Sequence, residues 1–328
     1  MAMVAEEASE ISGMLLAGSL TALGVLGPGL IGWRISQRKG VGLFPPARVW
    51  RWTWTGWELL AASMLLYFLP VLGVALGASY LEAPVWVFPL QVILLLVLFY
   101  RQVAALPAHP QASGEALVWP PRLALTAGIW ALATPTVLLV GGLVQTVYVY
   151  LGGEPEEHPL ASVDISTPYN AFLVIVQTCV VAPCVEEPLM RGLLLPWLLA
   201  PRPCNMQHGQ SRSWVLPWKM RAWLIMLLAS VPAYDGGSWE PLIFLAILAV
   251  GLLGLQGARI RHCRHWTAVY VSASLFAILH SQVWPSPIPL FVLGLVLGWL
   301  AVWTRGLLAP ILLHAFFNAV STLYLFLF

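Results

Sequence analysis

The sequence predicts an all-α protein, a polytopic helical membrane bundle of about eight core transmembrane helices plus an extra hairpin. The composition is the first reason, because 59% of the 328 residues are hydrophobic and only 9% are charged, against roughly 25% charged in an ordinary soluble domain. Apolar runs long enough to cross a bilayer, about 20 residues, recur along the whole chain, and the loops between them alternate in charge. The lipid bilayer is therefore the first expected partner. No basic patch of the kind that binds nucleic acid is evident.

The apolar runs give the order of the expected helices. Residues 1–160 hold generic transmembrane helices, and residues 161–328 hold a transmembrane core with an inserted hairpin near 222–256. The two weaker runs of the hairpin are 222–234 and 241–256. The eight stronger runs are 11–33, 57–79, 85–100, 123–151, 171–200, 266–282, 289–303 and 307–328.

Basic residues mark alternate loops as cytoplasmic by the positive-inside rule. The basic loops carry Arg34, Arg38, Lys39, Arg48 and Arg51, then Arg202, Arg212, Lys219 and Arg221, then Arg259, Arg261 and Arg264. The connections between them carry Glu154, Glu156, Glu157, Asp164, Asp235 and Glu240. Ten crossings, the hairpin included, place both termini outside, and eight crossings remain the alternative. We expect a multi-pass integral protein of the cell (plasma) membrane.

Three charged residues interrupt the apolar run at 171–200. Glu186, Glu187 and Arg191 stand near its middle, where a charged side chain costs roughly 2.5–3.5 kcal/mol. Glu187 and Arg191 are four residues apart, so they share one helical face and are expected to form an ion pair. Glu186 stands about 100° around the helix from Glu187, which leaves it free to point into a cavity. The trio predicts a functional site, with Glu186 as the better candidate base.

Two later runs carry polar residues at the same spacing of four. Phe276 is followed by His280, and His314 by Asn318. Counting about 1.5 Å per residue from the expected cytoplasmic ends places four groups roughly 10–21 Å deep in the bilayer. These four are Glu186, His280, His314 and Asn318. Polar groups from three helices in one layer can converge, as an intramembrane reaction site requires.

Two prolines flank the carboxylates within their helix. Pro183 and Pro188 have no backbone N–H, so in an α-helix each leaves a carbonyl four residues earlier without its partner, at Cys179 and Cys184. Freed carbonyls at membrane depth are tolerated only beside protein or water. We therefore expect the helix to kink or open beside a hydrated cavity at Glu186, although a packing kink without function would need the same prolines.

Three motifs in this part of the chain resemble one known family. They are Glu186-Glu187-x-x-x-Arg191, Phe276-x-x-x-His280 and His314-x-x-x-Asn318, and they are similar to the motifs of the CAAX-protease and bacteriocin-processing family, the type II CAAX prenyl endopeptidase-like intramembrane endopeptidases. The similarity covers residues from about 170 to 321. Two features depart from the family: Met190 stands where an aromatic residue is common, and about 90 residues separate Arg191 from His280.

The resemblance implies a glutamic endopeptidase that needs no cofactor. Glu186 would act as general base on a water molecule that His280 positions, and His314 with Asn318 would stabilise the oxyanion. Glu187, Arg191 and Phe276 would support these groups. The expected partner is a peptide or protein substrate, with a lipidated one as an option.

Two alternatives remain open from the residues alone. The first is a zinc-dependent intramembrane metalloprotease in which Glu186, His280 and His314 bind the metal, a chemically reasonable ligand set. The second is a non-catalytic membrane transporter or immunity-type protein that uses the same polar pocket to bind a ligand or a proton.

Overall fold

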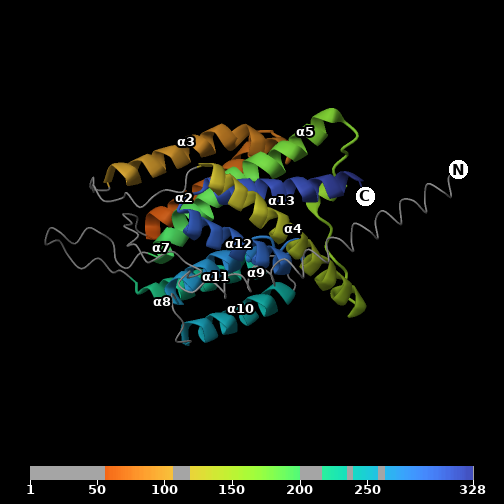
Figure 1. The fold of residues 1–328 in the computed structure, drawn as a ribbon. Coiled ribbons are helices and arrows are strands. Elements are labelled where there is room, and N and C mark those ends of the chain that lie inside the picture. The colour runs from red at the N-terminus through yellow and green to blue at the C-terminus, as the bar shows by residue number, and fades with distance from the viewer. Residues whose placement is uncertain (1–55, 106–118, 200–215, 235–238, 258–262, 328) are drawn as a thin grey trace.

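All regular structure in the described part of the chain is helical (Figure 1). The computed structural model describes residues 56–105, 119–199, 216–234, 239–257 and 263–327. Within them, four helical stretches are long and apolar enough to cross a membrane: Leu123–Tyr150, Pro168–Leu199, Glu240–Gly257 and Pro287–Thr304. Shorter apolar helices cover Leu59–Ala75, Glu82–Leu98 and Leu308–Tyr324. The predicted all-α membrane bundle is confirmed; its first expected span, 11–33, lies outside the described residues.

Helices α2 (Gly56–Ala75) and α3 (Glu82–Ala105) form an antiparallel pair. The chain turns between them at Gly77, whose φ of +100° is readily adopted by glycine. Glu82 then starts α3, and its Oε2 accepts a hydrogen bond of 3.1 Å from the Ser79 N–H. This hydrogen bond satisfies a backbone donor just before the helix start, and it fixes the turn that joins α2 to α3.

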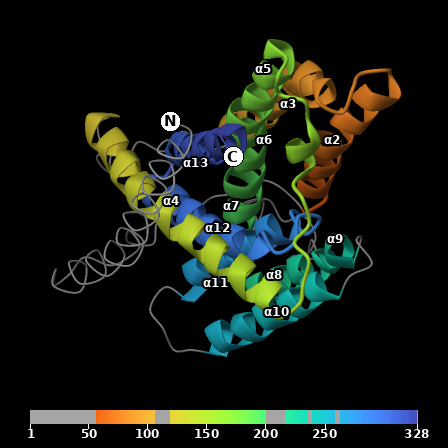
Figure 2. The same cartoon turned by 90° about the vertical axis from the view of Figure 1, so that its right-hand side faces the viewer.

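Helix α4 (Trp119–Tyr150) crosses the bundle and is joined to the next long helix by residues 151–167 (Figure 2). This connection contains the short 3-10 helix η1 (Pro159–Ser162). A reciprocal pair of hydrogen bonds fixes it to the loop after α11: the Glu156 N–H donates to the Trp284 carbonyl at 2.9 Å, and the Trp284 N–H donates to Glu156 Oε2 at 3.1 Å. The acidic connection therefore lies beside the segment that follows His280.

The carboxylates stand on one continuous helical rod with two π turns. Its parts are α5 (Pro168–Val176), η2 (Gln177–Val181), α6 (Ala182–Glu187), η3 (Pro188–Leu194) and α7 (Leu195–Leu199). Thr167 caps the start through its hydroxyl, and Pro168 occupies the first turn, where its missing N–H costs nothing. In η2 the Ala182 N–H donates to the Gln177 carbonyl, and in η3 the Leu195 N–H donates to the Met190 carbonyl, each five residues back.

The opening expected at the two prolines thus takes the form of π turns. The carbonyl left free before Pro183 is a different one from the carbonyl that we predicted. The α-helical register predicted a free carbonyl at Cys179, four residues before Pro183. In the π register the residue facing Pro183 is Thr178, five residues earlier. Its carbonyl is satisfied from another helix, as described below, which is how irregular helical backbone is tolerated at membrane depth.

The inserted stretch contains three helices rather than two. They are α8 (Trp218–Leu228), α9 (Ser230–Tyr234) and α10 (Glu240–Gly257). Helix α8 packs against α7 and α11, while α10 covers the outer side of α11. The Lys219 Nζ donates to the Gln256 carbonyl at 3.4 Å, so the start of α8 lies beside the end of α10.

The last three helices carry the remaining motifs. Helix α11 (Cys263–Ile278) packs most extensively against α12 (Pro287–Thr304), and α13 (Leu308–Leu327) lies against α4 and the rod at η2 and α6. A side chain at Gly294 would stand 3.0 Å from both Cα and Cβ of Ala273, so the absence of one allows α11 and α12 to approach closely. The predicted helix 266–282 ends early, because α11 stops at Ile278 and places His280 in the following turn.

Large apolar side chains remain exposed on the outer surface of the bundle. Phe68, Val71 and Val250 are each about 60% exposed or more, at 59%, 61% and 68%. Such a surface suits lipid contact rather than water. The buried core is shared mainly by η3, α7, α11 and α12, so the motif residues lie where the helices pack most tightly.

Candidate active site

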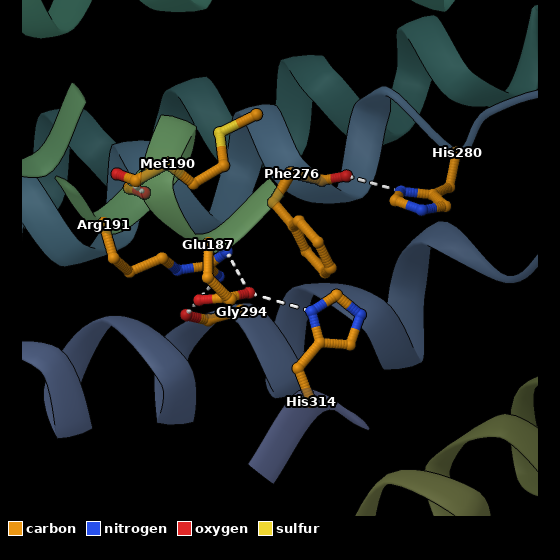
Figure 3. A network of polar contacts seen from close by, with 8 residues as sticks. Glu187, Met190, Arg191, Phe276, His280, Gly294 and His314 are labelled. Atoms are coloured by element: carbon orange, nitrogen blue, oxygen red, sulfur yellow. Dashed lines mark hydrogen bonds and ion pairs between the residues drawn. The ribbon is translucent and has the colours of Figure 1, made fainter. Parts of the chain in front are cut away.

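Glu187 is the centre of the polar network. It is fully buried, and its Oε1 accepts two hydrogen bonds, from Arg191 Nη1 at 3.0 Å and from His314 Nδ1 at 2.9 Å (Figure 3). The expected ion pair between Glu187 and Arg191 is present at that spacing of four. His314, however, contacts Glu187 and makes no hydrogen bond to Glu186. One carboxylate oxygen therefore joins the rod to α13.

The buried side chain of Arg191 is held by three groups: the Glu187 carboxylate, the Gly294 carbonyl and the Phe276 ring. Its Nη2 donates to the Gly294 carbonyl at 3.3 Å, and its guanidinium stands 4.7 Å above the ring centroid of Phe276. A buried guanidinium that pairs with a carboxylate, a carbonyl and an aromatic face is held in one orientation. Arg191 therefore links the rod to α11 and α12 at the level of Glu187.

Phe276 separates and positions the two histidines. Its ring centroid lies 5.0 Å from that of His280 and 5.6 Å from that of His314. His280 Nδ1 stands 2.8 Å from the Phe276 carbonyl (Figure 3). Because the His280 N–H instead donates to the Ala277 carbonyl, the Phe276 carbonyl at the end of α11 is free to accept this bond from the ring.

The hydrogen bonds assign the same tautomer to both rings. A carbonyl and a carboxylate can only accept, so Nδ1 of His280 and Nδ1 of His314 each carry a proton. The Nε2 atom of each ring is then left for a further partner. This arrangement gives the site two imidazole nitrogens fixed by groups behind them.

Glu186 differs from its neighbour in having no hydrogen bond. Its side chain is half-buried, and its Oε2 is buried without a partner. The charges of Glu186 and Arg191 both act on the phenol of Tyr67 in α2, so these three groups lie within electrostatic range of one another. Tyr67 is 44% exposed despite this position. The structure therefore presents Glu186 as the carboxylate that is not committed to packing.

Asn318 contacts the π turn rather than the histidines. Its Nδ2 donates to the Thr178 carbonyl at 2.8 Å, the carbonyl that faces Pro183 in the π register. One turn later on α13, the hydroxyl of Thr322 lies 3.0 Å from that of Thr178. Asn318 thus supplies the missing donor to η2, and its second amide N–H is left for another acceptor.

The comparison with protein families agrees with these motifs. Residues 168–320 match the family model described as type II CAAX prenyl endopeptidase Rce1-like. This region is similar to the Rce1-like family. The resemblance noted from the three motifs is confirmed in its CAAX-endopeptidase part, and the family points to a membrane-embedded protease in general. No curated protein and no solved structure matches the chain.

Two residues near the Rce1-like site were not expected from the sequence. One is Tyr67, which lies outside the matched region. The other is His158 in the connection 151–167, whose Nδ1 accepts from the Leu160 N–H at 3.1 Å. Desolvation and the nearby imidazole of His280 hold the pKa of His158 below its ordinary value. A lone tyrosine in an apolar run and a histidine in an acidic loop gave no periodic signal that could have identified them.

The described residues do not bring three His, Cys, Asp or Glu side chains close enough to hold a metal ion. Of the alternative zinc ligands, His314 is bound through Nδ1 to Glu187, an arrangement that in metal sites orients a ligating histidine. Glu186 and His280 share no hydrogen bond with it. A zinc site on the Rce1-like residues would therefore require these three side chains to move together.

Proposed function

We propose that the protein is an intramembrane endopeptidase that hydrolyses peptide bonds of membrane-associated substrates with a glutamate-activated water. The observation that carries the proposal is the contrast between two adjacent carboxylates. Glu187 accepts hydrogen bonds from Arg191 and His314 through Oε1, while its Oε2 is buried without a partner. Glu186 has no hydrogen bond in the described part of the chain, and its Oε2 is likewise buried without a partner. Unequal surroundings allow two neighbouring carboxylates to take different roles.

In the first step Glu186 accepts a proton from water while the water oxygen attacks the carbonyl carbon of the substrate. His280 accepts the second hydrogen bond of that water through Nε2, because its Nδ1 proton is already given to the Phe276 carbonyl. General base catalysis of this kind contributes typically 10²–10⁴-fold to the rate. The proton then passes from Glu186 to the leaving amine as the carbon–nitrogen bond breaks.

The oxyanion of the tetrahedral intermediate is stabilised from α13. For this role His314 takes up a second proton from solvent before the substrate binds. Its Nδ1–H is then directed to Glu187 and its Nε2–H to the oxyanion, and both protons stay on the ring. Asn318 offers the amide N–H that does not bond Thr178. Loss of one such donor costs about 2.7–4 kcal/mol in the transition state.

The substrate class follows from the bilayer and the family description. The surroundings of the site are apolar, so the scissile peptide belongs to a protein held at the membrane. A prenylated C-terminal peptide is the first candidate, because the matching family is described by that activity. The alternating charge of the loops supports a multi-pass membrane protein, and the cell membrane is its proposed location.

The test is single-turnover cleavage of a prenylated reporter peptide by purified protein in liposomes. Glu186→Gln should lower the cleavage rate at least about 100-fold while substrate affinity and thermal unfolding stay close to wild type. Wild-type activity should survive exhaustive chelation of zinc. Zinc-dependent activity restored by the metal would favour the metalloprotease alternative, and unchanged cleavage by the Glu186→Gln variant would reject the proposed base.

A further inference from the structure

His280 stands in a series of tight turns rather than on a helix. The Ser281 N–H donates to the Ile278 carbonyl at 3.0 Å, and the Val283 N–H donates to the His280 carbonyl at 3.1 Å. The imidazole contacts the carbonyl and the ring of Phe276 (Figure 3). Both contacts come from the last turn of α11, so they orient the imidazole relative to its own helix only. A functional group on such a segment needs support from other elements to keep a productive geometry.

Support of that kind comes from α9, in the inserted stretch. The hydroxyl of Ser281, the residue directly after His280, donates to the Pro232 carbonyl at 2.8 Å. Ser281 is only 7% exposed, and the low polarity of a buried position strengthens a hydrogen bond. The bond also satisfies a carbonyl near the end of a short helix, where the last carbonyls have no partner within the helix. The turn that carries His280 is therefore tied to a residue 49 positions earlier in the chain.

Helix α9 is itself fixed in the core of the bundle. Ala229, just before it, and Ala233 within it are fully buried, and both belong to the core cluster that contains Phe276. Val231 and Tyr234 are exposed, so one face of α9 packs inward and the other faces outward. Helix α9 also contacts α8 and α10. It can therefore serve as an anchor for the turn after α11.

The far end of the same segment is held by separate elements at Trp284. The Trp284 ring lies edge-to-face against Tyr148 of α4, with centroids 6.3 Å apart, and against Phe244 of α10, with centroids 6.2 Å apart. The backbone N–H and carbonyl of Trp284 both bond Glu156 in the connection after α4. The turn that carries His280 therefore lies between two fixed ends.

We propose that Ser281 is a positioning residue for His280, anchored to the Pro232 carbonyl of the inserted stretch. The inference rests on the proposed function, in which His280 Nε2 accepts a hydrogen bond from the attacking water. A shift of the turn would move Nε2 away from that water, and a displacement of about 1 Å can cost about 10²-fold in rate. About 90 residues separate Arg191 from His280, and this extra length then contributes to the geometry of the site.

Single-turnover cleavage of the prenylated reporter peptide in liposomes compares Ser281→Ala with Ser274→Ala. Ser274 is the matched control, because it is a buried serine of α11 whose hydroxyl donates to the Tyr270 carbonyl at 2.9 Å, within the helix. Ser281→Ala should lower the cleavage rate about tenfold to 100-fold with unchanged substrate affinity, and Ser274→Ala should cleave at the wild-type rate. The unfolding midpoints of the two variants should be similar, since each loses one hydroxyl hydrogen bond.

A second substitution shows whether Ser281 acts through His280. In the His280→Ala background, Ser281→Ala should cause no further loss of rate, because the group that it positions is already absent. An equal loss in both backgrounds, or an equal loss in the Ser274→Ala variant, overturns the proposal.

Solid-state NMR of protein with isotope-labelled histidine rings tests the positioning without relying on activity. The wild-type His280 signal, identified by its loss in His280→Asn, should report a proton on Nδ1, as the bond to the Phe276 carbonyl requires. Ser281→Ala should shift or broaden this signal, and Ser274→Ala should leave it unchanged. An unchanged signal in Ser281→Ala overturns the proposal, whatever the activity. If the signal changes but the wild-type protein cleaves no peptide, the proposed function fails and the positioning of His280 by Ser281 stands.

Discussion

A single carboxylate oxygen, Oε1 of Glu187, receives both Arg191 and His314. Charged hydrogen bonds in a buried position are strong, and they are expensive to break on one side only. This oxygen joins the rod to α13 through His314, and it joins the rod to α11 through Arg191, whose guanidinium lies above the Phe276 ring. The network therefore determines where Glu186 stands. The position of Glu186, which has no hydrogen bond, therefore depends on Glu187, which has two.

Arg191→Ala should destabilise the protein far more than Asn318→Ala. Removing Arg191 leaves part of a buried charge uncompensated, which costs about 3–5 kcal/mol. Removing the Asn318 amide breaks one neutral hydrogen bond, worth about 0.5–1.5 kcal/mol, although it should also slow cleavage. Thermal unfolding in detergent measures both variants. Equal midpoints for the two would show that the Glu187 network does not contribute as a buried ion pair.

The motif residues could be predicted from the sequence because charge is rare in an apolar helix. Glu186, Glu187 and Arg191 were therefore conspicuous, and the spacing of four correctly paired the last two. The partner of His314 could not be predicted, since the sequence gives no rotation of α13 against the rod. Asn318 was expected at an oxyanion, and its bond to Thr178 depends on a π register that residue types do not specify.

The connection 151–167 makes the stability depend on pH through His158. The pKa of His158 is held below its ordinary value of 6.5 by burial and by His280, so the folded state favours the neutral ring. As the pH falls through 6.5 the unfolded chain binds more protons than the folded one, and the free energy of unfolding decreases. Stability is thus highest above this range and is lost on acidification.

His158→Asn should reduce that dependence. The asparagine carbonyl can still accept from the Leu160 N–H, as Nδ1 of His158 does, while the titrating group is gone. Unfolding midpoints at about pH 7.5 and about pH 5.5 should differ less in the variant than in wild type. The same difference in both proteins would mean that other groups account for the acid sensitivity.

Helices α11 and α12 approach each other through small residues. Gly294→Ala would place a methyl group 3.0 Å from the Cα of Ala273, a backbone atom that cannot rotate away. The helices must separate, and the Gly294 carbonyl moves from Arg191. Gly298→Ala first meets a side-chain methyl of Val269, at 3.1 Å, while the Val269 Cα stands 3.7 Å away, at an ordinary contact distance. The methyl can adjust more easily than a backbone atom.

We expect Gly294→Ala to lower the unfolding midpoint and the cleavage rate together, with a loss of about 1–3 kcal/mol as for overpacked cores. Gly298→Ala should lose less than half of that and cleave nearly normally. Unfolding and single-turnover rates on both variants make the comparison. If Gly298→Ala proved the more damaging, close packing at Gly294 would not be what holds Arg191.

At the scale of the whole molecule, two sets of contacts between distant segments lie at opposite ends of the helices. At the end of α4 and the start of α5, Glu156 bonds Trp284, and Tyr169 donates to Glu82 at 2.8 Å. At the other end, the Lys219 Nζ donates to the Gln256 carbonyl and the Arg221 Nη1 donates to the Trp197 carbonyl. The acidic residues belong to the first set and the basic ones to the second, as the positive-inside rule requires.

Cysteine labelling from the two sides of sealed vesicles tests this orientation. In a chain whose native cysteines are replaced by serine, Glu157→Cys should react only from outside, and Lys219→Cys and Arg305→Cys only from the cytoplasmic side. Permeabilised vesicles serve as the control for accessibility. Reaction of Lys219→Cys and Glu157→Cys from the same side would refute the predicted alternation of the helices.

The helical class and most helix positions could be predicted because hydropathy and length constrain membrane spans strongly. Helix ends were less predictable: α11 stops before His280 because the last turn tightens, and the inserted stretch divides into α8, α9 and α10 rather than a simple hairpin. Packing partners depend on side-chain fit between helices that are all apolar. Hydropathy cannot distinguish one such partner from another.

The two π turns make the rod sensitive to its own length. A π turn behaves as an α-helix that has gained one residue, and the widened turn absorbs the surplus. A chain one residue shorter within Gln177–Val181 could close there as an ordinary α-helix of the same hydropathy. Its carboxylate pair would keep its direction, because the closed turn removes only the surplus that the π turn had absorbed. The same deletion outside the π turns, between them and the carboxylates, would instead rotate the pair by about 100°. Insertions and deletions in this helix therefore test whether the site requires a fixed number of residues in the rod. Substitutions cannot test this, because they leave the chain length unchanged.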